Sequence, residues 1–220
     1  MAENNNIQVK IPINKTSTIE GNLTIPPNAK AIVAFAHGSG SSRFSPRNQY
    51  VAKIFNQAEL ATLLIDLLTP EEEEIDVTTA EYRFNIDLLA ERLISATEWL
   101  KHDPTTQNLT FGYFGASTGA AAALIAAAKL PEDISAVVSR GGRPDLAGDY
   151  LSQVRAPTLF LVGGLDTEVL DLNQQAMDQM SAEKKLVVIP GATHLFEEPG
   201  KLEVVAKFST DWFLRYLVKC

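Results

Sequence analysis

Cysteine is almost absent from this chain, because the only one among its 220 residues is Cys220, at the last position. A lone cysteine cannot form a disulfide within the chain, and this one matches no metal-binding or nucleophile pattern, so we interpret it as a terminal thiol without a function. Long hydrophobic runs are absent too. The most apolar helical stretch, 120–128, is short and rich in alanine, which argues against a membrane span.

Positive charge is also in deficit, with 19 Lys and Arg against 27 Asp and Glu and a net charge of -8. Such a chain repels a phosphate backbone, so we expect neither nucleic acid nor a membrane surface as a partner. The first ten residues lack a basic segment followed by an apolar one, so we expect a cytoplasmic location. Because no linker rich in Pro, Gly or Ser divides the chain, we expect one domain over residues 1–220.

Short apolar runs alternate with longer amphipathic segments along the chain. Strands are expected at 9–13, 21–25, 31–36, 61–67, 109–114, 134–139, 158–162 and 185–189. Helices are expected at 46–58, 81–101, 117–130, 168–181 and 202–218. The last six runs are apolar almost throughout, as strands covered on both faces are. This order predicts an α/β fold with a doubly wound, mostly parallel sheet of about eight strands.

Four consecutive glutamates, Glu71 to Glu74, follow Pro70. Like charges in a row repel one another and favour water, so we expect a solvated loop at this point.

The motif G-x-S-x-G occurs once, as Gly115-Ala116-Ser117-Thr118-Gly119, where an expected strand passes into an expected helix. Such a turn pushes the serine hydroxyl out of the sheet, and its glycines remove side chains that would clash. Serine is a weak nucleophile at neutral pH, so it needs a base nearby and a third group to orient that base. Ser117 is the candidate nucleophile.

Three histidines could supply the base. His102 lies at the end of a helix, where a surface position is the ordinary explanation. His194 lies between the last expected strand and the final helix, so we expect it to be the base. The acid should lie between the serine and the histidine in the chain, which favours Asp166 after the strand at 158–162. Asp145 is a second carboxylate that could reach the same histidine.

The arginines near the expected carboxyl ends of the strands are Arg43, Arg47, Arg140 and Arg143. Their guanidinium groups could bind an acidic substrate, and whether Arg43 or Arg143 does so is left open. We expect structural pairing with nearby carboxylates instead. Arg143 in particular stands two residues from Asp145, which favours an ion pair over a catalytic role for this carboxylate.

The segment HGSGSSR, residues 37–43, follows an expected buried strand. Small residues let its backbone approach another group closely. A tetrahedral intermediate carries negative charge on the former carbonyl oxygen, and backbone N–H groups must point at it. We expect the N–H groups of Ser39 and Thr118 to form this oxyanion hole, with His37 bracing the loop by hydrogen bonds.

The order HG, GASTG, GGLDTEV and GATHLF resembles the α/β-hydrolase fold, and in particular the dienelactone hydrolase-like family of small hydrolases, over residues 11–217. The phrase SRGGRPDL, residues 139–146, is similar to bacterial members often fused to a phosphoribosyltransferase. The resemblance implies no large cap domain. The founding member of the family has a cysteine nucleophile where this chain has Ser117, so an ordinary ester or thioester is the implied substrate rather than dienelactone.

The expected protein is a serine hydrolase that cleaves small carboxylic esters of short to medium acyl chain through an acyl-enzyme. We expect no metal and no organic cofactor, and a monomer or a weak homo-oligomer. Alternatives are a lactone or thioester hydrolase, or a binding or regulatory protein that keeps the scaffold without its chemistry. A dinucleotide site is disfavoured by the spacing of Gly112, Gly115 and Gly119, and a P-loop by the lack of G-K-[ST].

Overall fold

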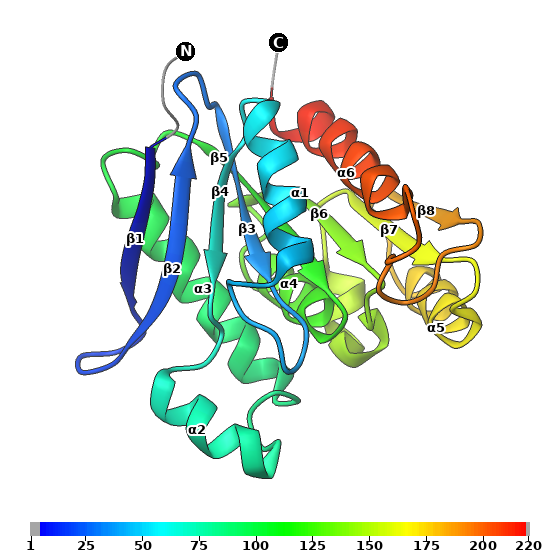
Figure 1. Cartoon of the computed structure of the whole chain (residues 1–220), viewed down its shortest axis with the longest axis horizontal. Coiled ribbons are helices and arrows are strands. Elements are labelled where there is room, and N and C mark those ends of the chain that lie inside the picture. Colours follow the sequence, from blue (N-terminus) through cyan, green and yellow to red (C-terminus); the bar gives the residue numbers. More distant parts are fainter. Residues whose placement is uncertain (1–4, 219–220) are drawn as a thin grey trace.

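An eight-stranded sheet runs through the middle of the molecule, with helices on both faces (Figure 1). The computed structural model describes residues 5–218, so Cys220 lies outside the described residues. The strands within this range are β1 (Asn5–Pro12), β2 (Thr18–Ile25), β3 (Ala31–Ala36), β4 (Ala61–Ile65), β5 (Thr110–Ala116), β6 (Ile134–Arg140), β7 (Thr158–Gly163) and β8 (Lys184–Ile189). Their order in the sheet is β1-β2-β4-β3-β5-β6-β7-β8.

Strands β3 to β8 are parallel to one another, whereas β1 pairs antiparallel with β2 and β2 pairs antiparallel with β4. The predicted doubly wound, mostly parallel sheet is therefore confirmed. Every residue of β3, β4 and β7 is buried, because helices cover both faces of these strands. This explains their uninterrupted apolar sequences.

The helices of the described residues are α1 (Pro46–Gln57), α2 (Pro70–Thr79), α3 (Ile86–His102), α4 (Thr118–Lys129), α5 (Thr167–Asp178) and α6 (Lys201–Leu217), with a 3₁₀ segment, η1 (Pro144–Gln153). Helices α1 and α6 pack together on one face of the sheet, and α3, α4 and η1 pack on the other (Figure 1). None of the helices in this part of the chain is both long and apolar enough to cross a bilayer.

Helix α2 forms where the sequence predicted a solvated loop, and that prediction is wrong. The Thr69 side chain accepts a hydrogen bond from the Glu72 N–H at 3.2 Å, and the Glu72 carboxylate accepts one from the Thr69 N–H at 2.8 Å. This capping box satisfies two backbone donors at the helix start. Glutamates in the first turn also lie at the positive end of the helix dipole, so their charges stabilise the helix instead of melting it.

The segment between α2 and α3 is a turn organised by Asp76, although the sequence predicted helix from Glu81 onward. Asp76 is buried, and its Oδ1 accepts the N–H groups of Tyr82 and Arg83 at 2.8 and 2.9 Å. Helix α3 then begins after Asn85, whose side chain accepts the Leu88 N–H at 3.1 Å. The asparagine cap, not the start of the charged stretch, sets the helix boundary.

Four phenylalanines join α1 and α6 to the sheet. Phe55 of α1 lies 5.6 Å from Phe35 of β3 and 5.4 Å from Phe213 of α6, measured between ring centroids. Phe114 of β5 completes the cluster at 4.9 Å from Phe35. Because all four rings are buried, this cluster fixes α1 and α6 over the strands whose ends carry the site described next.

Candidate active site

Ser117 lies in a strained turn between β5 and α4. Its φ of 51° and ψ of -123° are unfavourable for a residue with a side chain. The turn depends on its glycines, because a Cβ at Gly115 would lie 2.4 Å from the Cα of Ala120 and one at Gly119 would lie 2.2 Å from the carbonyl oxygen of Ala36. Although Ser117 occupies the N-cap position of α4, its hydroxyl does not cap the helix, so it is available for chemistry.

The imidazole of His194 contacts the carboxylate of Asp166, with 2.7 Å between Nδ1 and Oδ2. The two loops that carry these residues are tied together by their backbones, because the Leu165 N–H donates to the Ala192 carbonyl at 3.0 Å. An imidazole that donates from Nδ1 to a carboxylate keeps a lone pair on Nε2, which can then accept a proton. His194 is 37% exposed and Asp166 16%, so the pair borders solvent at its imidazole end.

The segment after β6 connects this pair to Ser117. The Ser117 N–H donates to the Arg140 carbonyl at 3.2 Å, and the next residue, Gly141, lies so close to His194 that a Cβ there would be 3.6 Å from the imidazole Cε1. The backbone of Ser117 and the imidazole of His194 therefore border the same segment at the carboxyl ends of β5 and β6. Within residues 5–218, the Ser117 hydroxyl makes no hydrogen bond to His194. Such contacts are often long in a free enzyme and tighten with substrate.

The loop after β3 lies directly against the serine turn. A Cβ at Gly38 would be 3.1 Å from the Cβ of Ser117. The Ser39 N–H, expected to face an oxyanion, instead donates to the Thr118 hydroxyl at 2.9 Å. The Thr118 N–H is in the first turn of α4, where backbone donors have no acceptor within the helix. The two N–H groups expected to form the oxyanion hole are thus adjacent, but that of Ser39 already donates a hydrogen bond to the Thr118 hydroxyl.

His37 braces this loop, as the sequence predicted. One ring nitrogen, Nδ1, lies 2.9 Å from the Gly38 carbonyl, and the other, Nε2, accepts the Leu67 N–H at 3.1 Å. Burial lowers the pKa of His37, so the neutral ring that these two contacts require is favoured. His102 lies on the surface, with Nδ1 2.7 Å from the Glu98 carbonyl.

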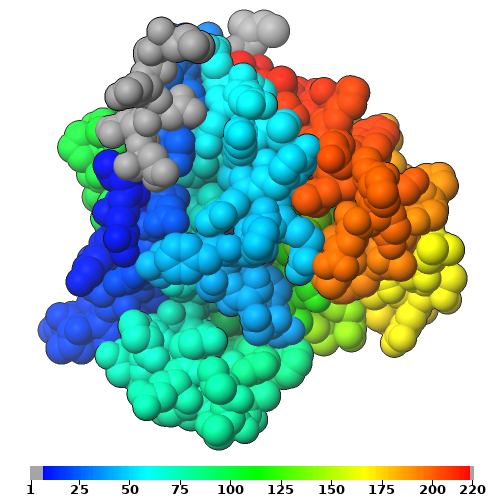
Figure 2. Space-filling model, in the orientation of Figure 1, coloured from blue at the N-terminus to red at the C-terminus, as the bar shows by residue number. Residues whose placement is uncertain are grey.

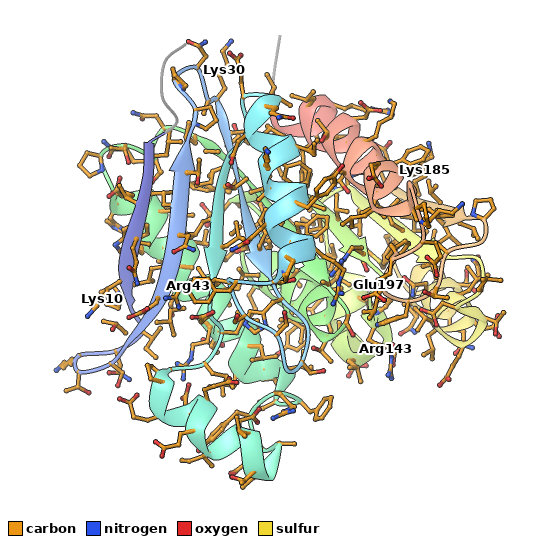
Figure 3. All side chains as sticks on the ribbon, in the orientation of Figure 1. Lys10, Lys30, Arg43, Arg143, Lys185 and Glu197 are labelled. Carbon is orange, nitrogen blue, oxygen red and sulfur yellow. The ribbon has the colours of Figure 1, made fainter. Side chains whose placement is uncertain are left out.

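Of the four arginines expected near the carboxyl ends of the strands, three are paired with carboxylates, as predicted. Arg43 binds Glu20 and Asp66, on the side of β2 and β4 (Figure 3). Arg47 pairs with Glu197 at 2.8 Å, and Arg143 holds Asp145 through two hydrogen bonds of 2.9 and 2.7 Å. Asp145 therefore contacts Arg143 and not His194.

Arg140 is the exception, and the prediction of structural pairing is wrong for it. It is the last residue of β6, yet none of the carboxylates in the described range lies within 4.0 Å of its guanidinium. Sequence alone could not show this, because the partner of an arginine depends on which loops fold against it.

Asn173 is a site residue that the sequence did not suggest. It is fully buried in α5, and its amide donates to the Gly142 carbonyl at 2.9 Å and to the Val169 carbonyl at 2.7 Å. It thereby holds the helix that follows Asp166 against the segment that borders Ser117. The only sequence feature that could have pointed to Asn173 is its position, a polar residue among the apolar ones on the buried face of α5.

In the space-filling view, green and yellow-green atoms are seen between the blue segment after β3 and the orange segment before α6 (Figure 2). The candidate site is built from these segments, which belong to distant parts of the chain. Within residues 5–218 no group of three or more His, Cys, Asp or Glu side chains is arranged to hold a metal ion.

Two solved structures of other proteins resemble the structure of this chain over almost its whole length. A crystal structure of a dienelactone hydrolase from Anabaena variabilis is 57% identical, covers 98% of this chain and 100% of that one, and superposes with a TM-score of 0.96. Est1E from Butyrivibrio proteoclasticus shares the fold at 17% identity, with 96% of this chain and 99% of that one covered and a TM-score of 0.80.

Curated relatives from Mycobacterium tuberculosis, strains CDC 1551 and H37Rv, are 58% identical over 199 residues, and their names assign them provisionally to the phosphoribosyl transferases. The match covers 90% of this chain and 44% of theirs, so this chain spans less than half the length of these relatives. Residues 23–216 match the Dienelactone hydrolase family. This chain therefore belongs to the dienelactone hydrolase family and has the α/β-hydrolase fold.

Proposed function

We propose that this protein is a serine hydrolase that cleaves small carboxylic esters through an acyl-enzyme, with Ser117, His194 and Asp166 as its catalytic residues. The observation that carries the proposal is the 2.7 Å contact between His194 Nδ1 and Asp166 Oδ2. It leaves Nε2 as the basic nitrogen, on an imidazole that borders the same segment as the strained serine turn. Membership of a hydrolase family supports the reaction class.

In the first half of the reaction, His194 Nε2 takes the proton of the Ser117 hydroxyl while the serine oxygen attacks the ester carbonyl carbon. Asp166 stabilises the imidazolium that forms and keeps its orientation. When the tetrahedral intermediate collapses, the same proton passes from His194 to the leaving alcohol. Water then attacks the acyl-serine by the same steps, which releases the carboxylic acid and restores the serine.

The oxyanion would be stabilised by the N–H groups of Thr118 and Ser39. The Thr118 hydroxyl, which accepts the Ser39 N–H in the free protein, would give up this hydrogen bond when the carbonyl oxygen arrives. An exchange of one hydrogen bond for another needs only a rotation of the threonine side chain. Each donor of this kind contributes about 2.7–4 kcal/mol to lowering the barrier.

An ester is favoured over the dienelactone of the family name because serine stands at the nucleophile position. The phosphoribosyl transferase name belongs to longer relatives, and this chain matches 44% of their length. In our proposal the matched part is the hydrolase part of those proteins. The esterases among the similar structures carry this fold, with identities too low to indicate a substrate.

Labelling with a fluorophosphonate, followed by mass spectrometry of the peptides, tests the proposal. The expected result is one adduct, on Ser117, together with turnover of short 4-nitrophenyl esters that Ser117→Ala abolishes. The control is Ser139→Ala, which removes a buried serine hydroxyl of the neighbouring strand and should leave labelling intact. Labelling elsewhere, or turnover that survives Ser117→Ala, would mean that the nucleophile has been assigned to the wrong residue, whereas the absence of both adduct and turnover would favour the alternative of a binding protein on a hydrolase scaffold.

A further inference from the structure

Arg140 carries a buried positive charge without a counter-ion. The residue is 7% exposed, and its Nε and Nη1 have no hydrogen-bond partner in the described part of the chain. Buried arginines are otherwise paired with carboxylates, because an unpaired buried charge is strongly destabilising. Arg43, which is just as buried, follows that rule with Glu20 and Asp66.

The guanidinium lies on the side of the sheet covered by α1 and α6. Side chains alternate along β6, and the residues two and four positions before Arg140, Val138 and Ala136, belong to the apolar core on that side. The guanidinium of Arg47, in the first turn of α1, is a second positive charge that acts on Arg140. Arg47 in turn pairs with Glu197, which lies in the loop that carries His194 and is labelled in Figure 3.

This position adjoins the candidate catalytic residues. The Arg140 carbonyl accepts the Ser117 N–H at 3.2 Å, and Gly141 lies so close to His194 that a Cβ there would be 2.9 Å from the His194 carbonyl oxygen. A substrate whose ester carbonyl is at Ser117 would therefore extend next to the backbone of Arg140, at the carboxyl end of β6. The Arg140 side chain leaves this strand end on the side of the sheet where α1 begins with Arg47 in its first turn.

We propose that Arg140, assisted by Arg47, binds an anionic oxyacid group of the substrate, a carboxylate or a phosphate, and so selects anionic esters. This inference rests on the proposed ester hydrolysis. A planar guanidinium presents its N–H groups as a fork that matches two oxygens of such a group. Serine and histidine perform the reaction, whereas Arg140 determines which esters reach them.

The charges around Arg140 are complementary to such a group. Burial and the positive charge of Arg47 lower the pKa of Arg140 to about 10, so the side chain is still positively charged at neutral pH. Two arginines and one glutamate leave an excess of one positive charge in the free protein. A bound anion would replace the repulsion between the two guanidinium groups with attraction to both.

The first test compares esters that differ only in charge. Phenyl acetates with a carboxylate or a phosphate in the para position are compared with methyl 4-acetoxybenzoate, and 4-nitrophenyl hydrogen glutarate with 4-nitrophenyl valerate, which places the anion on the acyl side. The wild type should favour at least one anionic ester in kcat/KM. Arg140→Met should lower the anionic-to-neutral ratio roughly 10- to 100-fold, and Arg140→Lys, which keeps the charge without the fork, should lower it less.

Arg155→Met and Arg215→Met are matched controls, because each removes one arginine charge that is already paired at the surface. Both should leave the ratio within about twofold of the wild type, since screened surface charges act weakly. An equal decrease in the controls would mean a general charge effect and would overturn the proposal. Whether the carboxylate esters or the phosphate ester lose their advantage in Arg140→Met identifies the chemistry of the bound group.

A binding experiment separates this proposal from the proposed function. In Ser117→Ala protein, benzoate or phenyl phosphate should raise Tm while benzamide does not, and the added Arg140→Met substitution should abolish the rise. The Tm of unliganded Arg140→Met should not fall, because an unpaired charge is removed. If neutral esters are hydrolysed, the anionic-to-neutral ratio is the same in Arg140→Met as in the wild type, and anions do not raise Tm, then the anion site is overturned and the proposed function is not. Anion binding that requires Arg140 without any ester turnover would support the anion site and overturn the proposed function.

Discussion

The hydrogen bond between Asp166 and His194 determines which nitrogen of the imidazole can act as a base. The carboxylate accepts the proton of Nδ1, so Nε2 is the nitrogen left with a lone pair. Asp145, the other carboxylate that sequence reasoning considered, is held by Arg143. These two aspartates follow neighbouring strands, so they form a natural pair for a comparison.

Asp166→Asn should lower kcat for 4-nitrophenyl acetate by about 10⁴-fold, because the amide favours the wrong imidazole tautomer. Asp145→Asn should reduce it less than tenfold, since its carboxylate contacts an arginine at the rim. Both variants should keep the far-ultraviolet circular dichroism of the wild type. A larger loss for Asp145→Asn would mean that the acid has been assigned to the wrong aspartate.

We expect His37 to make the stability of the protein depend on pH. Burial lowers its pKa in the folded state, so the unfolded chain binds the proton first as the pH falls below about 6.5. Protonation then favours unfolding, and stability decreases by up to about 1.4 kcal/mol per pH unit until the pKa of the folded state is reached.

Urea unfolding at pH 7 and pH 5 measures this contribution. His37→Gln should lose less free energy of unfolding between the two pH values than the wild type, because glutamine does not titrate. It should also be less stable at pH 7, where the contacts of the imidazole with Gly38 and Leu67 are complete. Equal losses on acidification in both proteins would contradict this role of His37.

Helix α4 brings the serine turn against the sheet, and it does so through small residues. Gly119 faces the carbonyl oxygens of Ala36 and His37, which a Cβ would approach to 2.2 and 2.4 Å. Ten of the residues of α4, from Thr118 to Ala127, are buried. The alanine-rich sequence of this helix therefore serves close packing between β3, η1 and α3.

Gly119→Ala should destabilise the protein by more than about 3 kcal/mol, since the new methyl group overlaps backbone that cannot move without displacing the loop after β3. Surviving folded protein should react slowly with a fluorophosphonate. Gly164→Ala is the control, because the nearest atom to its Cβ would be 3.3 Å away; it should cost much less in chemical denaturation. Similar costs for the two variants would show that the close approach at Gly119 is unimportant.

The elements that the sequence predicted well are those in which burial dictates composition. Strands covered on both faces must be apolar, and the helices between them carry apolar stripes, so patterns alone located them. Helix α2 has no apolar stripe, and its start was visible only as the capping pattern Thr69-Pro70-Glu71-Glu72. For the candidate site, the G-x-S-x-G motif and the chain order suggested which residues to consider. The hydrogen bond from the Ser39 N–H to the Thr118 hydroxyl and the lack of a carboxylate beside Arg140 could not be predicted, because they depend on which loops fold against each other.

The molecule as a whole has two apolar cores, one on each face of the sheet. The core beneath α1 and α6 contains the four phenylalanines, and the candidate site lies at its edge. Loops from β3, β5, β6, β7 and β8 meet there because parallel strands place all their carboxyl ends at one edge. Disturbing the core should therefore affect both stability and activity.

Phe55→Ala should lower the free energy of unfolding by about 3–5 kcal/mol, because the cavity it leaves is surrounded by rigid aromatic rings. The matched control is Phe84→Ala, at a phenylalanine that is 58% exposed, which should change stability by less than about 0.5 kcal/mol. Denaturant titrations of both variants decide the matter. Comparable losses would show that the cluster does not hold α1 and α6 in place.

Chemical trapping of the acyl-enzyme is the sharpest test of Ser117 as the nucleophile. The protein is mixed with a short 4-nitrophenyl ester, quenched in acid within the first turnovers, and digested for mass spectrometry. A single acyl group is expected on Ser117, and none on the Ser117→Ala protein. Turnover of the ester without acylation of Ser117, or acylation of another residue that turnover requires, would contradict this assignment.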